Sequence, residues 1–249
     1  MFKLLKKICG LMGFKLVDKN LIKNDRLISK FTYHKINTLI DKLFSNGLIN
    51  SVIQIGANDG KRFDVLNTFI KKYSPKAILV EPIKENYEDL KLNYKDQNNI
   101  FFENSAISVN NEINFLFKVD EQKFKFYDEH IKGITSFDKY HLLKHGVLNS
   151  HIKKENVNSI SFKKLIEKYS VNYLDLLMVD AEGYDGDIII DFLSNISLRP
   201  LIIFEYLHIK NKKLEKLIKI LISKNFIFYK LEENIICFPK ENEKFKNLV

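Results

Sequence analysis

Short apolar runs recur along the chain, separated by polar segments in which apolar residues return every three or four positions. Apolar runs of four to eight residues bounded by turn residues are typical of strands, and the intervening spacing is typical of amphipathic helices. We therefore expect core strands at 51–56, 77–82, 99–108, 173–183 and 199–208, with helices between them. Strands that alternate with helices predict a parallel sheet joined by right-handed crossovers.

The strand bodies show little polar alternation, as in the runs at 174–179 and 201–204, which is typical of strands buried on both faces. An alternating segment at 111–119 predicts one further strand. Two apolar runs on either side of Glu232, Glu233 and Asn234 predict a terminal hairpin. The predicted fold class is α/β: a Rossmann-like, mostly parallel seven-stranded sheet with a C-terminal antiparallel hairpin.

Residues 120–158 match no sheet element of this alternation. They carry four histidines, and aromatic residues at Phe124, Phe126, Tyr127, Phe137 and Tyr140. Long connections in compact domains are usually functional, so we interpret 120–158 as an insertion that covers the site. It would belong to a domain that spans residues 49–249.

Residues 1–48 form a predicted helical extension to that domain. The first residues are basic and amphipathic, with Phe2, Leu5, Ile8 and Met12 near one helical face. Lysines interrupt the apolar stretch and no small-residue cleavage site follows it, so neither a signal peptide nor a membrane span is expected. Such a helix can rest on anionic lipid or on a partner enzyme, or it can pack on the domain.

Composition limits the classes of partner. The sequence has 40 basic and 31 acidic residues, a formal net charge of +9, but its lysines are spread along the chain. Without a compact basic strip, a solvated surface is favoured over nucleic-acid binding. Cys9 and Cys237 have no metal-ligand spacing, which indicates a reducing compartment and a cytoplasmic protein, at most peripheral to the inner face of the membrane.

The candidate chemistry lies at the strand ends, because ligands of doubly wound sheets bind beyond the carboxyl ends of the strands. The first strand closes in the turn Gly56-Ala57-Asn58-Asp59-Gly60, whose glycines permit close approach of a ligand. Glu81 ends the second strand, where a carboxylate can accept hydrogen bonds from a ribose diol. No phosphate-binding G-K-[ST] loop is present, which argues against a nucleoside triphosphate.

The order of these blocks resembles the FkbM family of S-adenosylmethionine methyltransferases. The blocks are VIQIGANDG, ILVEPIKENYEDL, FFENSAIS, TSF and DLLMVDAEGYDGDII, between about Ser51 and Tyr206. The most specific block is the D-x-E-G-x-[DE] sequence formed by Asp180, Glu182, Gly183 and Asp185. The resemblance implies a class I methyltransferase fold and S-adenosylmethionine as cofactor.

The resemblance also implies roles for individual residues. The glycine turn would lie against the methionine part of the cofactor, Glu81 would bind the ribose, and Asp180 would stand beside the reacting methyl group. Glu182 would lie close to the methyl acceptor. The cofactor-binding residues predicted in this way are Gln54, Gly56, Asn58, Asp59, Gly60, Glu81, Pro82, Ser105, Ala106 and Asp180, with Ser105 and Ala106 beside the adenine.

Two positions depart from the family pattern. Gln54 stands where the family commonly has aspartate, so an amide would meet the cofactor's ammonium group without charge attraction. Met178 stands where the family often has lysine.

Methyl transfer to a hydroxyl needs a proton acceptor, for which Asp180, Glu182 and His208 are candidates because they follow core strands. The histidines of 120–158 join them if that segment folds over the site. Asp185 is equally suited to capping the helix that follows it. Asp180 with Glu182, or Glu205 with His208, could ligate a divalent ion, but nothing in their spacing demands one and no metal site is predicted.

The predicted function is O-methylation of a sugar or glycan precursor, of the kind used in bacterial surface polysaccharides. Two alternatives stay open at this point: methylation of RNA or another small molecule, and a non-catalytic cofactor-binding scaffold. The acidic DAEGYD block would repel nucleic-acid phosphates, which disfavours RNA as the methyl acceptor.

Overall fold

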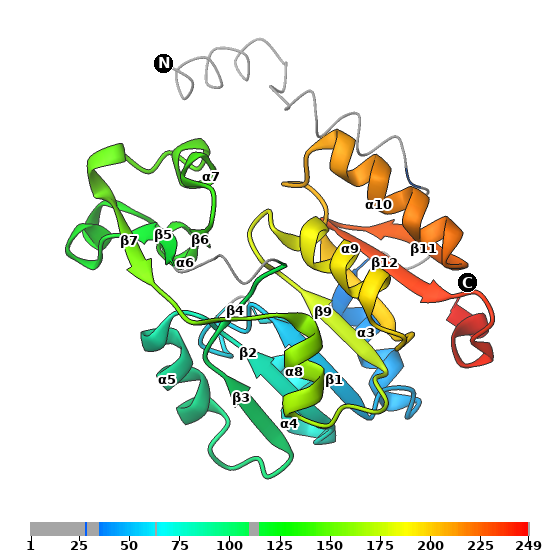
Figure 1. The fold of residues 1–249 in the computed structure, drawn as a ribbon. Coiled ribbons are helices and arrows are strands. Elements are labelled where there is room, and N and C mark those ends of the chain that lie inside the picture. The colour runs from blue at the N-terminus through cyan, green and yellow to red at the C-terminus, as the bar shows by residue number, and fades with distance from the viewer. Residues whose placement is uncertain (1–27, 29–34, 63, 110–114, 249) are drawn as a thin grey trace.

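A central sheet of seven strands organises the chain in the computed structural model, which describes residues 28, 35–62, 64–109 and 115–248 (Figure 1). The strand order is β11-β12-β10-β9-β1-β2-β3. The strands are β1 (Ser51–Ile55), β2 (Lys76–Val80), β3 (Ile100–Glu103), β9 (Leu176–Val179), β10 (Leu201–Glu205), β11 (Phe226–Leu231) and β12 (Asn234–Pro239).

Six of these strands run in one direction, and β12 alone is reversed, pairing antiparallel with both β10 and β11. The predicted α/β class, the mostly parallel seven-stranded sheet and the terminal hairpin are therefore confirmed. The chain winds from β1 toward β3 in one direction and then from β9 toward the hairpin in the other. The gap between the carboxyl ends of β1 and β9 is thus the switch point at which such sheets bind ligands.

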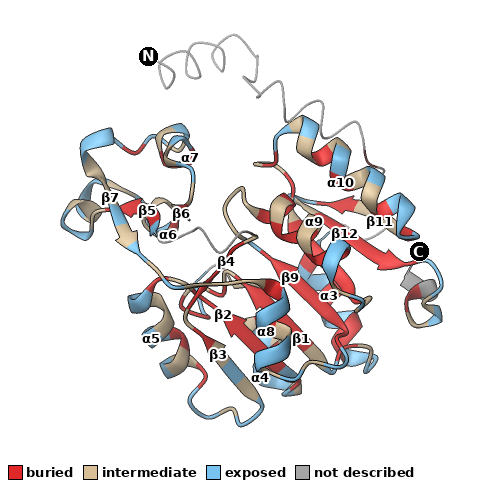
Figure 2. Ribbon diagram, in the orientation of Figure 1, coloured by how far each residue is buried: buried red, intermediate tan, exposed pale blue. Residues whose placement is uncertain are grey.

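Helices cover both faces of the sheet, and the strands are buried between them (Figure 2). Alternate strand residues point to opposite faces, so Val52 and Ile53 belong to different apolar clusters. One cluster includes α8 (Phe162–Lys168), α9 (Asp185–Asn195) and α10 (Asn211–Ser223). The other includes α3 (Ile36–Ser45), α4 (Asn67–Tyr73) and α5 (Lys84–Asn93).

The segment predicted as an N-terminal extension contributes to this core. Helix α3 buries Ile36, Leu39, Ile40, Leu43 and Phe44 against the sheet. The predicted amphipathic helix near the start of the chain lies outside the described residues. Among the helices that the structure describes, none has the length and apolar character needed to cross a membrane.

Residues 115–156 form a small three-stranded sheet, β6-β5-β7, with its own apolar cluster (Figure 1). The expectation that 120–158 contains no sheet element is wrong, because β6 and β7 pair antiparallel with β5. The segment holds β5 (Phe115–Val119), η1 (Glu121–Phe126), α6 (Glu129–Gly133), β6 (Thr135–Ser136), α7 (Lys139–Lys144), η2 (Asn149–His151) and β7 (Ile152–Asn156). Strands β4 (Ala106–Ile107) and β8 (Ser159–Ile160) pair where the chain enters and leaves it, and η3 (Glu243–Leu248) follows β12.

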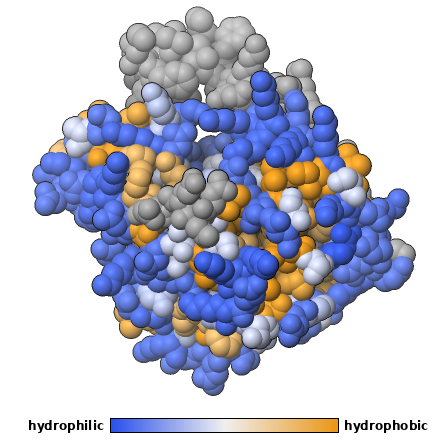
Figure 3. Space-filling view, in the orientation of Figure 1, coloured by the Kyte–Doolittle hydropathy of each residue, from blue (hydrophilic) through white to orange (hydrophobic). Residues whose placement is uncertain are grey.

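A buried lysine joins the small sheet to the core. The Lys118 ammonium on β5 pairs with Glu121 at 2.6 Å, Glu155 at 3.8 Å and Glu85 of helix α5 at 3.5 Å. A buried charge requires such partners, so the lysine fixes the small sheet beside the carboxyl edge of β2. Elsewhere hydrophilic side chains cover most of the face seen in Figure 3, in keeping with lysines spread over the surface.

Among the glycines that the structure describes, Gly56, immediately after β1, makes the closest approach to another part of the backbone. Its φ of +79° is strained for other residues, and a Cβ there would stand 1.8 Å from the carbonyl oxygen of Asp180. Only glycine lets the ends of β1 and β9 meet this closely. The contact therefore determines how far apart the two strands lie at the switch point.

Gly56→Ala is expected to destabilise the protein by at least about 3 kcal/mol, because backbone overlap adds to the cost of a positive φ. Gly47→Ala is the matched control: Gly47 has a φ of +67°, but a Cβ there would meet no atom within 4 Å, so this variant should lose only about 1–2 kcal/mol. Urea denaturation of both variants measures the difference. Equal losses would show that the contact with Asp180 is not limiting.

Candidate active site

The carboxyl ends of β1, β2, β9 and β10 open into one pocket, and α6 and the end of α7 form its opposite wall. Seven of the residues predicted from the sequence line it: Gln54, Gly56, Asn58, Glu81, Asp180, Glu182 and His208. A smaller hollow continues toward β3 and is lined by Pro82, Ser105 and Ala106. The structure therefore brings ten of the predicted residues to one connected site.

Asp59 and Gly60 lie behind the glycine turn and line neither hollow. Asp59 is buried and pairs with Arg62 at 2.6 Å, which holds the turn closed. A Cβ on Gly60 would lie 2.4 Å from Leu90 and 2.6 Å from Tyr94, so this glycine packs against α5. Both residues shape the loop from outside the pocket.

Glu81 is the buried carboxylate that joins β2 to the glycine turn. Its two oxygens accept backbone hydrogen bonds from Asn58 and Ile83, each at 2.9 Å. The side chain of Asn86 donates a third hydrogen bond, so about one of the four acceptor positions of the carboxylate stays open to a further donor. Burial raises the pKa of Glu81 to about 7, although these hydrogen bonds act in the opposite direction.

Gln54 has an unused acceptor in the pocket. Its amide nitrogen donates to Asp64 at 3.0 Å, while its buried Oε1 has no hydrogen-bond partner within the described part of the chain. Asp64 also lines the pocket, and burial raises its pKa. The carboxyl group missing at position 54 is thus present one side chain away, on a residue that sequence reasoning did not single out.

The other side of the pocket gathers carboxylates from the loop after β9, the end of β10 and the turn of the terminal hairpin. Asp180 follows β9 and faces the pocket, yet the surrounding protein and then the negative charge of Glu182 raise its pKa to about 7. Burial, together with the charges of Asp185 and Asp180, raises the pKa of Glu205 to about 10. Glu233, from the terminal hairpin, completes this acidic wall. Like charges held this close favour a cation or a hydrogen-bond donor between them.

The loop of Glu182 is strained and held in place from both sides. Glu182 has a φ of +47°, uncommon for a residue with a side chain. Its carbonyl oxygen accepts from Ser136 Oγ at 2.9 Å, and its Oε2 lies 2.9 Å from His141 Nε2. Backbone strain persists only where surrounding contacts impose it, and it often marks functional residues.

Asp185 supports this loop from beneath. It is fully buried, and its carboxylate accepts hydrogen bonds from the backbone nitrogens of Ala181 at 3.2 Å and Gly183 at 3.1 Å. The expectation that Asp185 caps α9 is wrong, because Tyr184 occupies the N-cap and Asp185 is the first helical residue. Its structural role is to fix the loop that carries Glu182.

Histidines from distant parts of the sequence meet at the same pocket. His130 and His145 line it from the small sheet, together with His208 from the loop after β10. His141 lies against Glu182, whereas His151 stacks on Phe126 outside the site. Sequence reasoning had no means of placing these side chains together, although the one-turn spacing of His141 and His145 was a visible signal.

The family model for the methyltransferase FkbM domain matches residues 54–228. This match covers most of the chain and runs from the end of β1 through β2, β3, β9 and β10 to the start of β11. The chain belongs to the FkbM methyltransferase family, which confirms the relationship predicted from its motifs.

Solved structures with related folds include a methyltransferase FkbM from Methylobacillus flagellatus KT, with 12% identity and a TM-score of 0.45. The match covers 77% of this chain but 44% of that protein. A ribosomal protein L11 methylase from Lactobacillus delbrueckii subsp. bulgaricus is 13% identical, with coverage of 86% and 82% and a TM-score of 0.42. The N-terminal domain of human METTL16, in complex with SAH, is 11% identical, with coverage of 82% and 68% and a TM-score of 0.42.

These likenesses are too distant to support any argument about substrate. None of the curated proteins matches the chain.

Ligands that donate hydrogen bonds to Glu81 should bind more weakly at low pH, because only the ionised carboxylate is purely an acceptor. With a pKa of about 7, Glu81 passes from mostly ionised at pH 8 to mostly protonated at pH 6, a loss of up to about tenfold in affinity. Calorimetric titration with S-adenosylhomocysteine at both pH values measures the change.

Glu81→Gln is the control, since it retains any pH dependence that comes from the ligand's own amino group. A pH dependence as steep in this variant as in the wild type would contradict the assignment.

Proposed function

We propose that the protein is an S-adenosylmethionine-dependent O-methyltransferase whose acceptor is a sugar or glycan precursor. The observation that supports this most strongly is that residues suited to the cofactor and carboxylates suited to an acceptor hydroxyl line the same pocket. The glycine turn, Gln54 and Glu81 lie on one side, and the carboxylates Asp180 and Glu182 lie on the other.

The residues present suit this cofactor. The unpartnered Oε1 of Gln54 can accept a hydrogen bond from the cofactor's ammonium group, with the carboxyl group of Asp64 beside it. The acceptor position that Glu81 keeps open suits a ribose hydroxyl, and the hollow at Pro82, Ser105 and Ala106 suits the adenine. The acidic wall complements a sulfonium, which is positively charged.

When bound, the cofactor supplies a methyl group that an acceptor oxygen attacks in line, so that a C–O bond forms, the S–C bond breaks and its electron pair stays on sulfur. Asp180 and Glu182 orient the acceptor hydroxyl by accepting its hydrogen bond, and one of them receives the released proton. Orientation is the principal contribution expected of the protein, on the order of 7–11 kcal/mol in the best cases.

The shape and charge of the neighbouring groove support a phosphorylated sugar as acceptor. The groove shares Glu182, His145 and His208 with the pocket and continues past Lys144, Lys210 and Lys213. Lys213 is paired with Asp187. Hydroxyl-binding carboxylates and imidazoles beside lysines match a sugar that carries phosphate. Of the aromatic residues of 120–158, Phe137 lines this groove and offers a ring face to a sugar.

The setting proposed for this reaction is the cytoplasm. The basic segment at the start of the chain would bring the enzyme to the inner face of the membrane or to a partner enzyme. This attachment rests on sequence alone.

Asp180→Asn and Glu182→Gln are each expected to lower turnover by about 10²–10⁴-fold, because they act on the acceptor. Affinity for S-adenosylhomocysteine, which has no sulfonium charge, should change by less than about threefold. Transfer of labelled methyl groups from S-adenosylmethionine to a panel of sugar nucleotides and lipid-free glycans measures turnover. Asp191→Asn on the outer end of α9 is the control and should match the wild type. Undiminished turnover in both variants would overturn their assigned roles.

The same assay separates the acceptor classes. Labelling of RNA instead of sugars, with affinity that falls steeply as salt rises, would replace the sugar acceptor by a nucleic acid. Cofactor binding without labelling of any acceptor would favour the scaffold alternative.

A further inference from the structure

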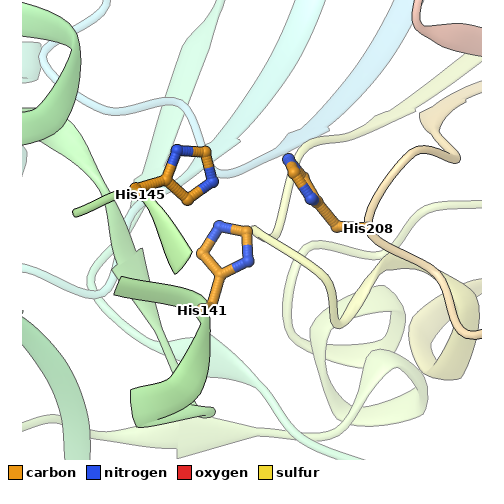
Figure 4. A group of neighbouring side chains, drawn as sticks. All are labelled: His141, His145 and His208. Carbon is orange, nitrogen blue, oxygen red and sulfur yellow. The ribbon is translucent and has the colours of Figure 1, made fainter. Parts of the chain in front are cut away.

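Three imidazoles converge where the pocket meets the lysine-lined groove (Figure 4). His141 lies on α7 and His145 is at its C-cap, one helical turn later, so both project from the same side of the helix. His208 approaches from the loop after β10. The ring centroid of His141 lies 4.7 Å from that of His145 and 4.5 Å from that of His208, and the other two are 5.3 Å apart.

The spacing of their nitrogens approaches that of metal ligands. One ring nitrogen from each histidine lies within 4.8 Å of the other two. Nitrogens bound tetrahedrally to zinc at about 2.0–2.1 Å stand roughly 3.4 Å apart, so side-chain shifts of about 1 Å would bring these rings onto one ion. His145 and His208 are half-buried, which leaves their side chains room to make such shifts.

Hydrogen bonding to protein groups does not account for the cluster. His141 has a carboxylate partner in Glu182, and His208 lies 3.4 Å from Glu205. Among the residues that the structure describes, the His145 ring contacts other imidazoles, and no hydrogen-bond partner is found for its nitrogens. Three imidazole rings beside Glu182 and Glu205 bring together nitrogen and oxygen atoms that can ligate a metal ion. Side-chain packing alone does not explain why they are so close.

We propose that His141, His145 and His208 bind one divalent transition-metal ion, with zinc or another imidazole-preferring metal as the occupant. Imidazole nitrogens favour such ions over magnesium or calcium. Glu182 and Glu205 lie within reach of the same point: Glu182, Glu205 and His208 form an overlapping group whose ligand atoms are also within 4.8 Å of one another. These carboxylates orient the imidazoles and balance the charge of the ion.

The ion would lie at the acceptor side of the pocket with one coordination position open. Three protein ligands and an open fourth position are typical of catalytic zinc. This role rests on the proposed function: the acceptor hydroxyl would bind at the open position, where a metal lowers the pKa of a bound oxygen. The inference departs from the sequence prediction that no metal site exists, because the sequence could not show that His208 lies beside α7.

The test uses the full-length protein after treatment with chelator and buffer exchange. Titration with Co²⁺ is followed by visible absorption, and titration with Zn²⁺ by calorimetry, both without S-adenosylmethionine. The wild type should bind one equivalent of either metal, and Co²⁺ should give the intense visible bands of a tetrahedral nitrogen site. His145→Ala and His208→Ala should each weaken binding at least about 100-fold.

His151→Gln is the matched control, because it alters a histidine of the same small sheet outside the cluster and should bind like the wild type. Circular dichroism shows whether each variant is folded. A folded wild type that takes up less than one equivalent, or equal binding by all three variants, would overturn the metal site.

A second arm separates this inference from the proposed function. S-adenosylhomocysteine binding to the chelated wild type tests the cofactor site alone, so its absence counts against the methyltransferase and leaves the metal titration unaffected. With acceptor present, restoring one equivalent of metal should raise methyl transfer by at least about tenfold in the wild type. Equal rates with and without metal would overturn the role in acceptor binding.

Discussion

The crowding of carboxylates at one edge of the sheet is the constraint on which the site depends. Parallel strands all end at the same edge, so Glu81, Asp180 and Glu205, each at or just after its own strand, are forced into one region. Burial and mutual repulsion raise the pKa of Asp180 and Glu205, and burial raises that of Glu81. Protons relieve this repulsion when the site is empty, and a bound cation can take their place. The site therefore suits cationic ligands, such as a sulfonium, an ammonium group or a metal ion.

The rest of the fold keeps this edge together against that repulsion. Gly56 lets β1 approach β9 closely, backbone amides donate to Glu81, and Asp185 fixes the loop that bears Glu182. The buried Lys118 holds the small sheet beside the core, which places α6 and α7 over the pocket. The two sides of the pocket therefore come from different parts of the chain. The side proposed for the cofactor comes from β1 to β4, and the side proposed for the acceptor comes from the small sheet and the later strands.

The sequence predicted the sheet, the hairpin and most of the pocket, because buried parallel strands are continuous apolar runs and their ends carry the ligand-binding residues. Strand β7 was missed since its residues are mostly charged and pair with β5 through the backbone. The meeting of His208 with His141, and of Gln54 with Asp64, depends on how loops fold over the strand ends. Periodicity along the chain carries no information about such contacts, so the histidine cluster emerged only from the structure.

The central claim is that this acidic edge binds S-adenosylmethionine. Calorimetric titration of the purified protein with S-adenosylmethionine, alongside Glu81→Ala and with NAD as a control ligand, tests it most directly. The account predicts micromolar binding of S-adenosylmethionine that is lost in Glu81→Ala, and no binding of NAD. A folded wild-type protein that does not bind S-adenosylmethionine, or that binds NAD equally well, would contradict it.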